Sequence, residues 1–463
     1  MIKRTLGEIA VMVNGTRHGG EDSLPVTGVS KDTRTIGPGN LYVPLIGARF
    51  DGHEYAAEAI ARGASAALWQ SDRGEPPAGV PVIVVDDSLA AMQRLASRYR
   101  EQLPVRIVGI TGSNGKTTTK DMIAAVLAVR YKVHKTEGNL NGDIGLPLMI
   151  LQMDESTELA VLEMGMRGFG EIELLAQIAR PEAAVITMIG EAHLERLGSR
   201  EGIARAKLEL LGGLRENGLF AYNGDEPLLE TLLPSTVKPR AFARVRFGTG
   251  ADNDLRAEEI VMEQDGTRFT VSSEAGSEFR IPLLGRHNAV NALAAIAIGR
   301  HFGLSDADIA SGLERMQPTG MRIERLKGVS GLTILNDAYN ASPASTLASL
   351  ELLKELTGYS RKIVVLGDML ELGEREEQFH REVGSTLTPE GADYVCTFGP
   401  LSKHTAAAAG VSFPEGRVRS FDSKEDLARH IAGFASGDDV VLVKGSRGMQ
   451  LEEVVRQLAE APL

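Results

Sequence analysis

The sequence predicts an α/β protein of three domains: a small N-terminal α/β domain, a central domain built on a parallel sheet, and a C-terminal Rossmann-like α/β domain. At 463 residues the chain is too long for one ordinary core, because domains average about 150 residues. Short apolar runs alternate with amphipathic helical patterns, which is typical of parallel sheets covered by helices on both faces. Glycine is abundant and aromatic residues make up only 5%, which suits the many tight turns of such a fold.

The first domain is expected to span residues 1–103. Residues 71–80 are rich in Pro and Gly and are expected to form a loop, which is followed by a strand at 82–86 and a helix at 89–103. Pro104 then opens a new apolar run, so we place the first boundary directly before it.

The central domain is expected to span residues 104–316. At residues 255–284, Val, Phe, Thr and Ile alternate with polar residues as in antiparallel strands, and a long helix follows at 287–302. The earlier part of this domain predicts buried parallel strands with helices between them, at residues 105–110, 159–164, 183–189 and 219–222.

The third domain is expected to span residues 317–463, with a linker at 316–322 leading into it. Its alternating pattern is similar to a dinucleotide-binding fold, although its first strand is not followed by G-x-G-x-x-G. The expected strands, again with helices between them, lie at residues 332–335, 363–366, 394–398 and 440–443.

Composition excludes several classes of protein. The net charge of -12, with no segment rich in Lys and Arg, argues against a nucleic-acid partner. Cys396 is the only cysteine, so neither an internal disulfide nor a Cys-rich metal site is possible. No run approaches the roughly 18 apolar residues of a membrane span, and the first 13 residues do not resemble a signal peptide. We therefore expect a soluble, cytoplasmic protein without membrane insertion.

A glycine-rich loop at residues 109–118, Gly-Ile-Thr-Gly-Ser-Asn-Gly-Lys-Thr-Thr, lies between the strand at 105–110 and a helix predicted at 121–131. Its small residues let backbone N–H groups face phosphate oxygens, the lysine adds positive charge, and a threonine hydroxyl can reach Mg²⁺ at a helix N-terminus. Ile110 stands where the common pattern G-x-x-x-x-G-K-[ST] has glycine, so a glycine-rich turn with a chance lysine is the alternative. The loop predicts ATP or GTP binding through Gly112, Ser113, Asn114, Gly115, Lys116, Thr117 and Thr118.

Polar residues follow several predicted strands, at the sheet edge where open α/β proteins bind ligands. Glu163 ends an apolar run and could bind the Mg²⁺ of a nucleotide, although a helix cap or an arginine partner would also explain it. His193 holds an equivalent position, where a lone histidine is more often a satisfied loop residue than a metal ligand. Lys207 lies on a helix whose charged residues look solvated.

The helix at 287–302 begins with two amide side chains among alanines. Asn291 lies one turn beyond His287, on the same helical face, and Asn288 lies close by. An adenine edge offers the donor and acceptor pair that an Asn amide can match, whereas simple capping of the helix end is the alternative.

Taken together, these segments resemble the Mur ligase family, the ATP-dependent enzymes that form amide bonds in bacterial cell-wall synthesis. The resemblance extends over nearly the whole chain and is far more specific than the loop alone. It rests on motifs in all three domains: Asp32-Thr-Arg34 with Pro38-Gly, Phe50-Asp-Gly-His53, Thr136-Glu-Gly-Asn139-Leu-Asn141, Ile144-Gly-Leu-Pro147, Asn336-Asp337-Ala-Tyr339-Asn340-Ala-Ser-Pro343, Leu366-Gly-Asp368-Met-Leu-Glu371-Leu-Gly373 and Lys444-Gly-Ser446-Arg447-Gly.

The resemblance implies a site for ATP and Mg²⁺ in a central P-loop ATPase domain. Lys116 and Thr117 would hold the phosphates and the metal, and Glu163 and His193 would complete the metal sites. Lys207 matches a lysine that is N-carbamoylated in several members, which would turn a cation into a carboxylate facing Mg²⁺. The implied catalytic residues are Lys116, His193 and Lys207, and the implied further nucleotide contacts are Asn291, Arg322 and Asp337.

The resemblance also implies two small-molecule substrates, UDP-N-acetylmuramoyl-tripeptide and D-alanyl-D-alanine, which the enzyme would join through an acyl-phosphate intermediate. It further implies that the protein is a monomer. The UDP end would be held by Ser30, Arg34, Asp51 and His53. The remaining implied substrate contacts are Asn139 and Asn141 in the central domain, and Tyr339, Asn340, Lys444, Ser446 and Arg447 in the C-terminal domain. The chain departs from the family pattern, without losing a charge at the phosphates, at Asn141-Gly-Asp143, Asn336-Asp337 and Ser342-Pro343.

Other functions remain open on the sequence. A sister ligase, adding either the third stem residue or a glutamate to folate, would share the ATP site, but the motifs around Asn340 and at 367–373 favour the dipeptide-adding ligase. A nucleotide switch or motor would also use the loop, although no Asn-Lys-x-Asp guanine-reading motif is present. A non-enzymatic binding module would leave the polar strand ends unexplained.

Overall fold

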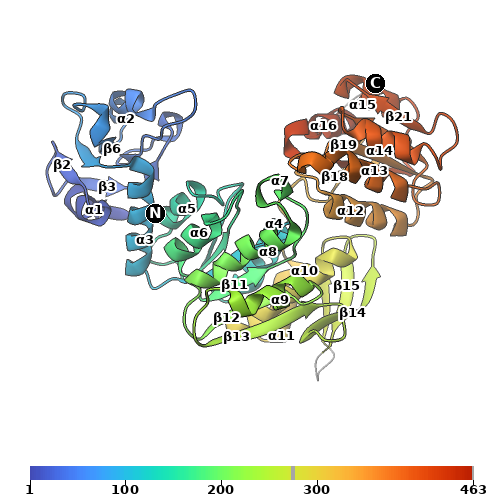
Figure 1. Ribbon diagram of the computed structural model, residues 1–463, viewed down its shortest axis with the longest axis horizontal. Helices are drawn as coiled ribbons and strands as arrows, with labels where there is room; N and C mark the ends of the chain where they lie inside the picture. The colour runs from blue at the N-terminus through green and yellow to red at the C-terminus, as the bar shows by residue number, and fades with distance from the viewer. Residues whose placement is uncertain (273–276, 461–463) are drawn as a thin grey trace.

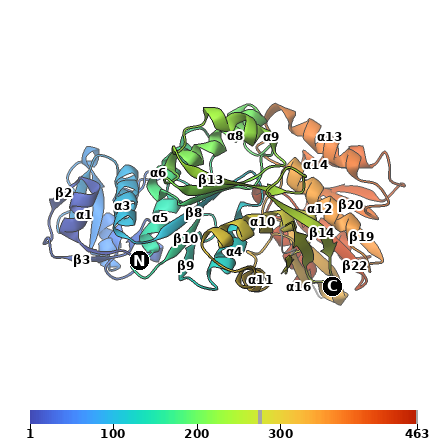
Figure 2. The same ribbon diagram turned by 90° about the horizontal axis from the view of Figure 1, so that it is seen from below.

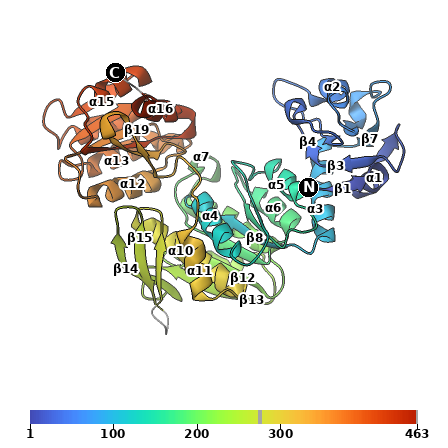
Figure 3. The ribbon, with the colours of Figure 1, turned by 180° about the vertical axis from the view of Figure 1, so that it is seen from behind.

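The computed structural model describes residues 1–272 and 277–460 as three α/β lobes along a curved line, with the N- and C-terminal lobes at opposite ends of the central one (Figures 1 and 3). Each lobe has a main sheet of its own, and a small two-stranded sheet joins β1 (Lys3–Thr5) to β3 (Pro25–Thr27). The three-part α/β fold predicted from the sequence is therefore confirmed.

The N-terminal lobe contains a five-stranded sheet in which only β2 runs antiparallel to its neighbour. Its strands, in spatial order, are β2 (Thr16–His18), β7 (Val82–Val85), β6 (Ala66–Gln70), β5 (Leu41–Tyr42) and β4 (Val29–Ser30). The helices of this lobe are α1 (Leu6–Val13), α2 (Ala56–Ala61) and α3 (Ser88–Gln102).

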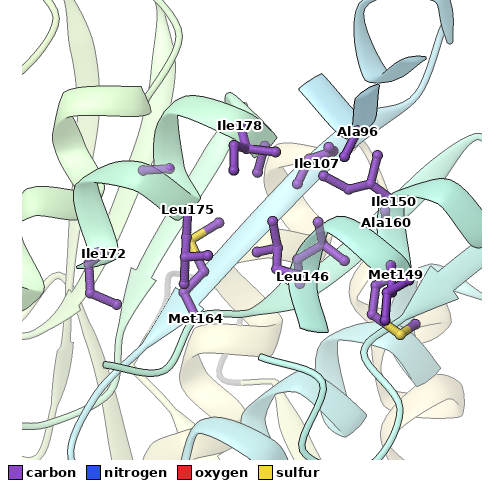
Figure 4. Packing of buried hydrophobic residues seen from close by; sticks show 14 of the residues in the cluster. Ala96, Ile107, Leu146, Met149, Ile150, Ala160, Met164, Ile172, Leu175 and Ile178 are labelled. Carbon is purple, nitrogen blue, oxygen red and sulfur yellow. The ribbon is translucent and has the colours of Figure 1, made fainter. Parts of the chain in front are cut away.

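Helix α3 attaches the N-terminal lobe to the central one. Asp87 caps its start by accepting a hydrogen bond of 2.6 Å from Ala90 N, and an apolar stripe that includes Leu95 is buried against the central lobe. The Tyr99 hydroxyl donates to Met153 O at 2.9 Å, and Arg100 Nε donates to Ala179 O at 2.8 Å. Figure 4 shows Ala96 of α3 in the same cluster as Ile107, Leu146 and Ile150 of the central lobe. The two lobes therefore share one hydrophobic core.

The central lobe contains a nine-stranded sheet. From β9 to β14 neighbouring strands are parallel, and β14, β15 and β16 are antiparallel, as the alternation at 255–284 predicts. The strands, in spatial order, are β16 (Glu278–Ile281), β15 (Thr267–Val271), β14 (Leu255–Met262), β13 (Phe242–Gly248), β12 (Gly218–Asn223), β11 (Ala183–Ile186), β8 (Arg106–Thr111), β10 (Leu159–Glu163) and β9 (Val133–Lys135).

Helices cover both faces of the central sheet (Figure 2). One face packs against α5 (Gly145–Gln152), α6 (Glu171–Ala179), α8 (Arg200–Leu208) and α9 (Pro227–Leu232). The other face packs against α4 (Lys116–Leu127), α10 (Arg286–His301) and α11 (Asp306–Glu314). The short helix α7 (Leu194–Leu197) points toward the C-terminal lobe.

The sequence placed one important boundary wrongly. The helix predicted at 121–131 is α4, which begins at Lys116 and ends at Leu127. The error arises because Gly115 adopts a left-handed conformation, with φ of 81°, that turns the chain directly into the helix. Lys116 and Thr117 therefore belong to the first helical turn, where backbone N–H groups are free to bind an anion.

The C-terminal lobe contains a six-stranded sheet that is parallel except for β17, an edge strand not predicted from the sequence. Its strands, in spatial order, are β17 (Glu324–Lys327), β18 (Thr333–Asp337), β22 (Asp439–Lys444), β19 (Arg361–Gly367), β20 (Tyr394–Phe398) and β21 (Val418–Phe421). Helices α12 (Pro343–Glu355), α13 (Glu376–Thr386) and α14 (Ser402–Ala409) cover one face, and α15 (Lys424–Ala432) and α16 (Glu452–Glu460) cover the other.

Across the described part of the chain, no helix combines the length and the apolar character that crossing a membrane would require.

The shared core predicts a stability effect at α3. We expect Leu95→Ala to lower the free energy of unfolding by about 2–5 kcal/mol, because the lost methyl groups leave a cavity at a fully buried position. Chemical denaturation followed by circular dichroism measures the change. Val237→Ala, at a residue that is 75% exposed, is the control and should change stability by less than about 0.5 kcal/mol. Equal stability of the two variants would contradict a core shared across α3.

Candidate active site

The glycine-rich loop is a sharp turn between β8 and α4. Gly112 has φ of 152°, and a Cβ atom built on it would lie 1.9 Å from Thr187 Oγ1 at the end of β11. A side chain at this position would therefore collide with the neighbouring strand as well as strain the backbone. Thr187 Oγ1 in turn donates to Asn114 O at 2.5 Å, which fixes the loop against β11.

Lys116 folds back over this loop. Its Nζ donates to Gly112 O at 2.6 Å and to Ser113 O at 3.3 Å, so the ammonium group lies where the loop carbonyls converge. Burial lowers the pKa of Lys116, while the charge of Glu163 acts to raise it. The cation is thus held beside the free N–H groups at the start of α4, and phosphate oxygens are suitable replacements for the two carbonyl partners.

Thr117, Glu163 and Asn141 form a connected group at the ends of α4 and β10. The Thr117 hydroxyl donates to Glu163 Oε2 at 2.8 Å, and Asn141 Nδ2 donates to Glu163 Oε1 at 2.9 Å. Glu163 is only 3% exposed, and its backbone N–H donates to Thr136 Oγ1 at 2.9 Å. Arg322, from the linker to the C-terminal lobe, donates from Nη2 to Thr117 Oγ1 at 2.9 Å. The carboxylate of Glu163 therefore faces the phosphate loop.

His193 joins the central and C-terminal lobes. It lies at the start of α7 in a left-handed conformation, with φ of 66°, and its Nδ1 is 2.9 Å from Glu371 Oε2. Burial lowers the pKa of His193, and the Glu371 carboxylate partly offsets this effect. The ring is oriented by the C-terminal lobe, and it lines the same cavity as the phosphate loop.

Lys207 is buried rather than solvated, which corrects the expectation from its helix. It is 2% exposed and lines the cavity, and its Nζ has no hydrogen-bond or ion-pair partner among the residues that the structure describes. Burial, followed by the nearby charge of Lys116, holds the pKa of Lys207 well below its ordinary value. Its ammonium group therefore loses a proton more readily than that of an exposed lysine.

The two asparagines of α10 differ in role. Asn288 Nδ2 donates to Leu284 O at 2.9 Å and so ties the helix start to the preceding segment, while the N-cap position itself is Gly285, which has no capping side chain. Asn291 faces the phosphate loop, since a Cβ atom on Gly115 would lie 2.9 Å from Asn291 Oδ1. The amide of Asn288 also accepts a weak hydrogen bond of 3.4 Å from Asn291 Nδ2 and so orients it. Of the pair, Asn291 is placed to meet a ligand at the loop.

The C-terminal lobe contributes a buried ion pair. Lys444 Nζ donates to Asp337 Oδ2 at 2.6 Å and to Asn340 O at 3.1 Å. The Arg322 guanidinium stacks over the Tyr339 ring, 4.3 Å from its centroid. His287 of α10 faces this group, and burial lowers the pKa of His287 to about 4, so its imidazole is neutral.

One cavity of about 1290 Å³ joins these residues. It runs from the phosphate loop to the C-terminal lobe and also reaches Lys31 of the N-terminal lobe. The expected site residues that line it are Ser113, Asn114, Gly115, Lys116, Thr117, Thr118, Asn139, Asn141, Glu163, His193, Lys207, Asn291, Arg322, Asp337, Tyr339, Asn340 and Lys444.

Several expected substrate contacts do not line this cavity. His53 is 4% exposed, with Nδ1 at 2.6 Å from Asp51 Oδ1, and its Nε2 accepts from Gln70 N at 3.2 Å. The structure therefore gives His53 a supporting role inside its lobe, and both of its ring nitrogens are engaged there. The others are likewise held by near neighbours: Ser30 by Thr35, Arg34 by Asp32, Ser446 by Leu370 and Arg447 by Glu452.

Sequence reasoning missed three cations that line the cavity. Lys31, Arg167 and Arg196 are exposed, and no ion pair involves their side chains among the described residues. Lys31 adjoins the Asp-Thr-Arg motif, and Arg167 follows Glu163 by four residues. Their closeness to these predicted site residues could have indicated that both cations lie at the site. Nothing in the sequence indicated that Arg196 lies at the site, because a lone arginine on a charged helix is usually solvated.

Comparison with known proteins places the chain in a family. Models described as the Mur ligase family catalytic domain, the Mur ligase middle domain and the Mur ligase glutamate ligase domain match residues 25–100, 110–299 and 321–447. The UDP-N-acetylmuramoyl-tripeptide–D-alanyl-D-alanine ligase of Bacillus subtilis is 49% identical over 464 residues, which cover 100% of both chains.

Solved structures agree. A MurF crystal structure from Acinetobacter baumannii has a TM-score of 0.90 and 28% identity, and the match covers 100% of both chains. The MurF ligase of Thermotoga maritima in complex with ADP has a TM-score of 0.82 and 29% identity, covering 94% of this chain and 97% of that one. This chain belongs to the Mur ligase family.

The geometry of the loop predicts the effect of a single methyl group. We expect Gly112→Ala to lower the free energy of unfolding by roughly 1–3 kcal/mol, because the new Cβ atom collides with Thr187 and the backbone is strained. Thermal unfolding measures the loss, and amide exchange of residues 112–118 locates it. Gly212→Ala is the control, since the nearest atom to its Cβ, Val237 Cγ1, is 4.0 Å away. If both variants were equally stable, the loop would not need a glycine here.

Proposed function

We propose that this protein is an ATP-dependent ligase that joins D-alanyl-D-alanine to the terminal carboxylate of UDP-N-acetylmuramoyl-tripeptide and forms the pentapeptide precursor of peptidoglycan. The observation that carries the proposal is one continuous cavity of about 1290 Å³, which the phosphate loop and polar groups of all three lobes line. This exceeds the roughly 300–1,000 Å³ of an ordinary small-molecule site, as a three-substrate reaction requires. The 49% identity with the Bacillus subtilis ligase supports the choice of substrates.

A peptide carboxylate is a poor electrophile, so it needs a leaving group before an amine can attack it. In the first step, an oxygen of the tripeptide's terminal carboxylate attacks the γ-phosphorus of ATP. The bond from this phosphorus to the β–γ bridging oxygen breaks, which yields ADP and an acyl phosphate. Lys116 and the N–H groups at the start of α4 stabilise the charge on the transferring phosphoryl group.

In the second step, the neutral amine of D-alanyl-D-alanine attacks the carbonyl carbon of the acyl phosphate. The tetrahedral intermediate then breaks its bond to the phosphate oxygen, and inorganic phosphate leaves with the bonding electrons as the amine releases a proton. Tyr339, Asn340 and Lys444 line the part of the cavity contributed by the C-terminal lobe and are proposed to position the dipeptide. Asn139 and Asn141 are proposed to hold the sugar-peptide portion. Catalysis thus depends mainly on positioning.

The residues at the phosphate loop fit Mg²⁺. The Thr117 hydroxyl and the Glu163 carboxylate, 2.8 Å apart, are oxygen donors of the kind that Mg²⁺ prefers. Bound there, Mg²⁺ would offset the negative charge of the ATP phosphates. Within the described residues, no group of three or more His, Cys, Asp and Glu side chains is placed to hold a metal alone. Phosphate oxygens of the nucleotide would supply further ligands. His193 and Lys207 are proposed as further ligands.

Lys207 is proposed to carry a carbamate. Its neutral nitrogen attacks the carbon of CO₂, a nitrogen–carbon bond forms, and a proton is released. The negative group would lie near Lys116 and the proposed Mg²⁺ site, where opposite charge favours it. A buried lysine, which has no partner within the described part of the chain, is thereby changed into a group that the site can stabilise.

The three lobes are proposed to act as domains that span residues 1–103, 104–316 and 317–463. The first is proposed to bind the UDP end, and the position of Lys31 in the lining of the cavity supports this. Asn291, Arg322 and Asp337 are proposed to contact the nucleotide. We propose a cytoplasmic location, because both ATP and the UDP-linked substrate are compounds of the cell interior. We also propose that the protein acts as a monomer.

A substrate panel tests the proposed function. We expect phosphate release from ATP only when UDP-N-acetylmuramoyl-tripeptide and D-alanyl-D-alanine are both present, because the acyl phosphate needs a carboxylate and then an amine. Phosphate release and mass spectrometry of the product measure this, and Lys116→Ala is the inactive control. Turnover with a muramoyl-dipeptide and a diamino acid, or with folate and glutamate, would indicate a sister ligase. Full hydrolysis without any acceptor would indicate a switch or motor.

The carbamate predicts a dependence on CO₂. We expect kcat of the wild-type enzyme to fall by at least about tenfold when dissolved CO₂ is removed, and to recover with bicarbonate, because a ligand to the metal is lost and regained. Lys207→Ala should be inactive at every bicarbonate concentration. Lys132→Ala, at a side chain that is 60% exposed, is the control and should behave as the wild type. Activity that ignores CO₂ would contradict a carbamate on Lys207.

A further inference from the structure

In the linker between the central and C-terminal lobes, the hydrogen-bond partners change from one lobe to the other within three residues. The backbone N–H and the hydroxyl of Thr319 both donate to Asp121 Oδ2 of α4, at 3.1 and 2.6 Å. Met321, in contrast, donates its N–H to Glu324 Oε2 at 3.0 Å and accepts a hydrogen bond from Tyr339 N at 3.3 Å. The linker backbone is thus bound to the central lobe at Thr319 and to the C-terminal lobe at Met321.

Asp121 of α4 is the anchor of this linker on the central lobe. Its side chain is 1% exposed, and Lys135 Nζ donates to its other oxygen, Oδ1, at 2.7 Å. Lys120 Nζ lies 3.4 Å from the same oxygen and donates to Thr136 O, the residue whose hydroxyl holds the backbone of Glu163. A buried carboxylate with this set of donors cannot move without leaving several polar groups unpaired.

Arg322 follows Thr319 by three residues and reaches the phosphate loop. Asp121 and Thr117 are four residues apart on α4 and so lie on one face of the helix, where they meet Thr319 and Arg322 respectively. Met321 and Ile323, on either side of Arg322, have φ of 63° and 54°, a conformation that non-glycine residues adopt only where their surroundings impose it. Arg322 Nε is buried and has no hydrogen-bond partner among the residues described in the structure. The guanidinium therefore has an unused donor in a constrained position.

We propose that Asp121, through its hydrogen bonds to Thr319, is a positioning residue that fixes the linker so that Arg322 reaches the nucleotide at Thr117. The two contacts on α4 act together. The contact of Asp121 with Thr319 sets where the chain leaves the central lobe, and this position lets Arg322 reach Thr117 beside the phosphates. The inference rests on the proposed function in one respect, which is that Arg322 contacts the bound nucleotide.

The hydroxyl of Thr319 allows a narrow test, because Thr→Val preserves the shape of the side chain. The affinity for ADP with Mg²⁺, measured by calorimetry, is compared among the wild type, Thr319→Val, Thr319→Ser, Arg322→Ala and the Thr319→Val/Arg322→Ala double variant. We expect Thr319→Val to weaken ADP binding about tenfold, as the loss of a hydrogen bond to a charged group would, and Thr319→Ser to restore it. Asp121→Asn should weaken binding in the same direction.

The double variant separates positioning from simple stabilisation. If Thr319 acts through Arg322, Thr319→Val should change ADP affinity by less than about twofold in the Arg322→Ala background, since residues of one network are not additive. Thr231→Val removes a similar hydroxyl from the surface of α9 and is the matched control, with unchanged affinity. An unchanged affinity in Thr319→Val, or the same tenfold loss in both backgrounds, would overturn the inference.

The proposed function can fail separately. A wild-type protein that does not bind ADP at all would contradict the nucleotide site itself. A wild type that binds ADP, together with additive variants, would leave the nucleotide site in place and remove the positioning role of Asp121.

Discussion

The turn from β8 into α4 is the constraint on which the rest of the site depends. Gly112 lies so close to Thr187 that no side chain fits, and Gly115 turns the chain directly into the helix at Lys116. Because α4 starts here, Thr117 meets the carboxylate at the end of β10, and the next turn of the helix presents Asp121 to the linker. One helix therefore carries the phosphate contacts and the attachment of the C-terminal lobe.

The two outer lobes are joined to the central one by different kinds of contact. Helix α3 buries an apolar stripe in a core shared with α5 and α6, so the N-terminal lobe is held firmly. The C-terminal lobe is held largely by single polar contacts, such as Asn114 Nδ2 to Ser342 Oγ at 3.1 Å and His193 to Glu371. Small apolar contacts around Ile323, and between Leu194 and the C-terminal core, add to them. Such contacts can break and re-form as ligands enter and leave, as expected of an interface between domains.

Sequence patterns predicted the features that depend on residues close together in the chain. The phosphate loop, Glu163 at a strand end and the alternation at 255–284 each depend on neighbouring residues, and the structure has all three. The start of α4 was misplaced because a left-handed Gly115 is not visible in a hydrophobic pattern. Asp121 was missed because its partner is 198 residues away. His53 is buried with both ring nitrogens engaged inside its lobe, which its membership of a motif could not reveal, and the burial of Lys207 arises only from tertiary packing.

The most direct test of the account is the fate of a labelled oxygen. The central claim is that the phosphate loop serves to activate a carboxylate, so that one carboxylate oxygen must leave with the phosphate. UDP-N-acetylmuramoyl-tripeptide carrying ¹⁸O in its terminal carboxylate is turned over with ATP and D-alanyl-D-alanine, and the inorganic phosphate is analysed by mass spectrometry. The account predicts one ¹⁸O atom in each phosphate released from doubly labelled substrate. Unlabelled phosphate at the full rate of ATP turnover would contradict it.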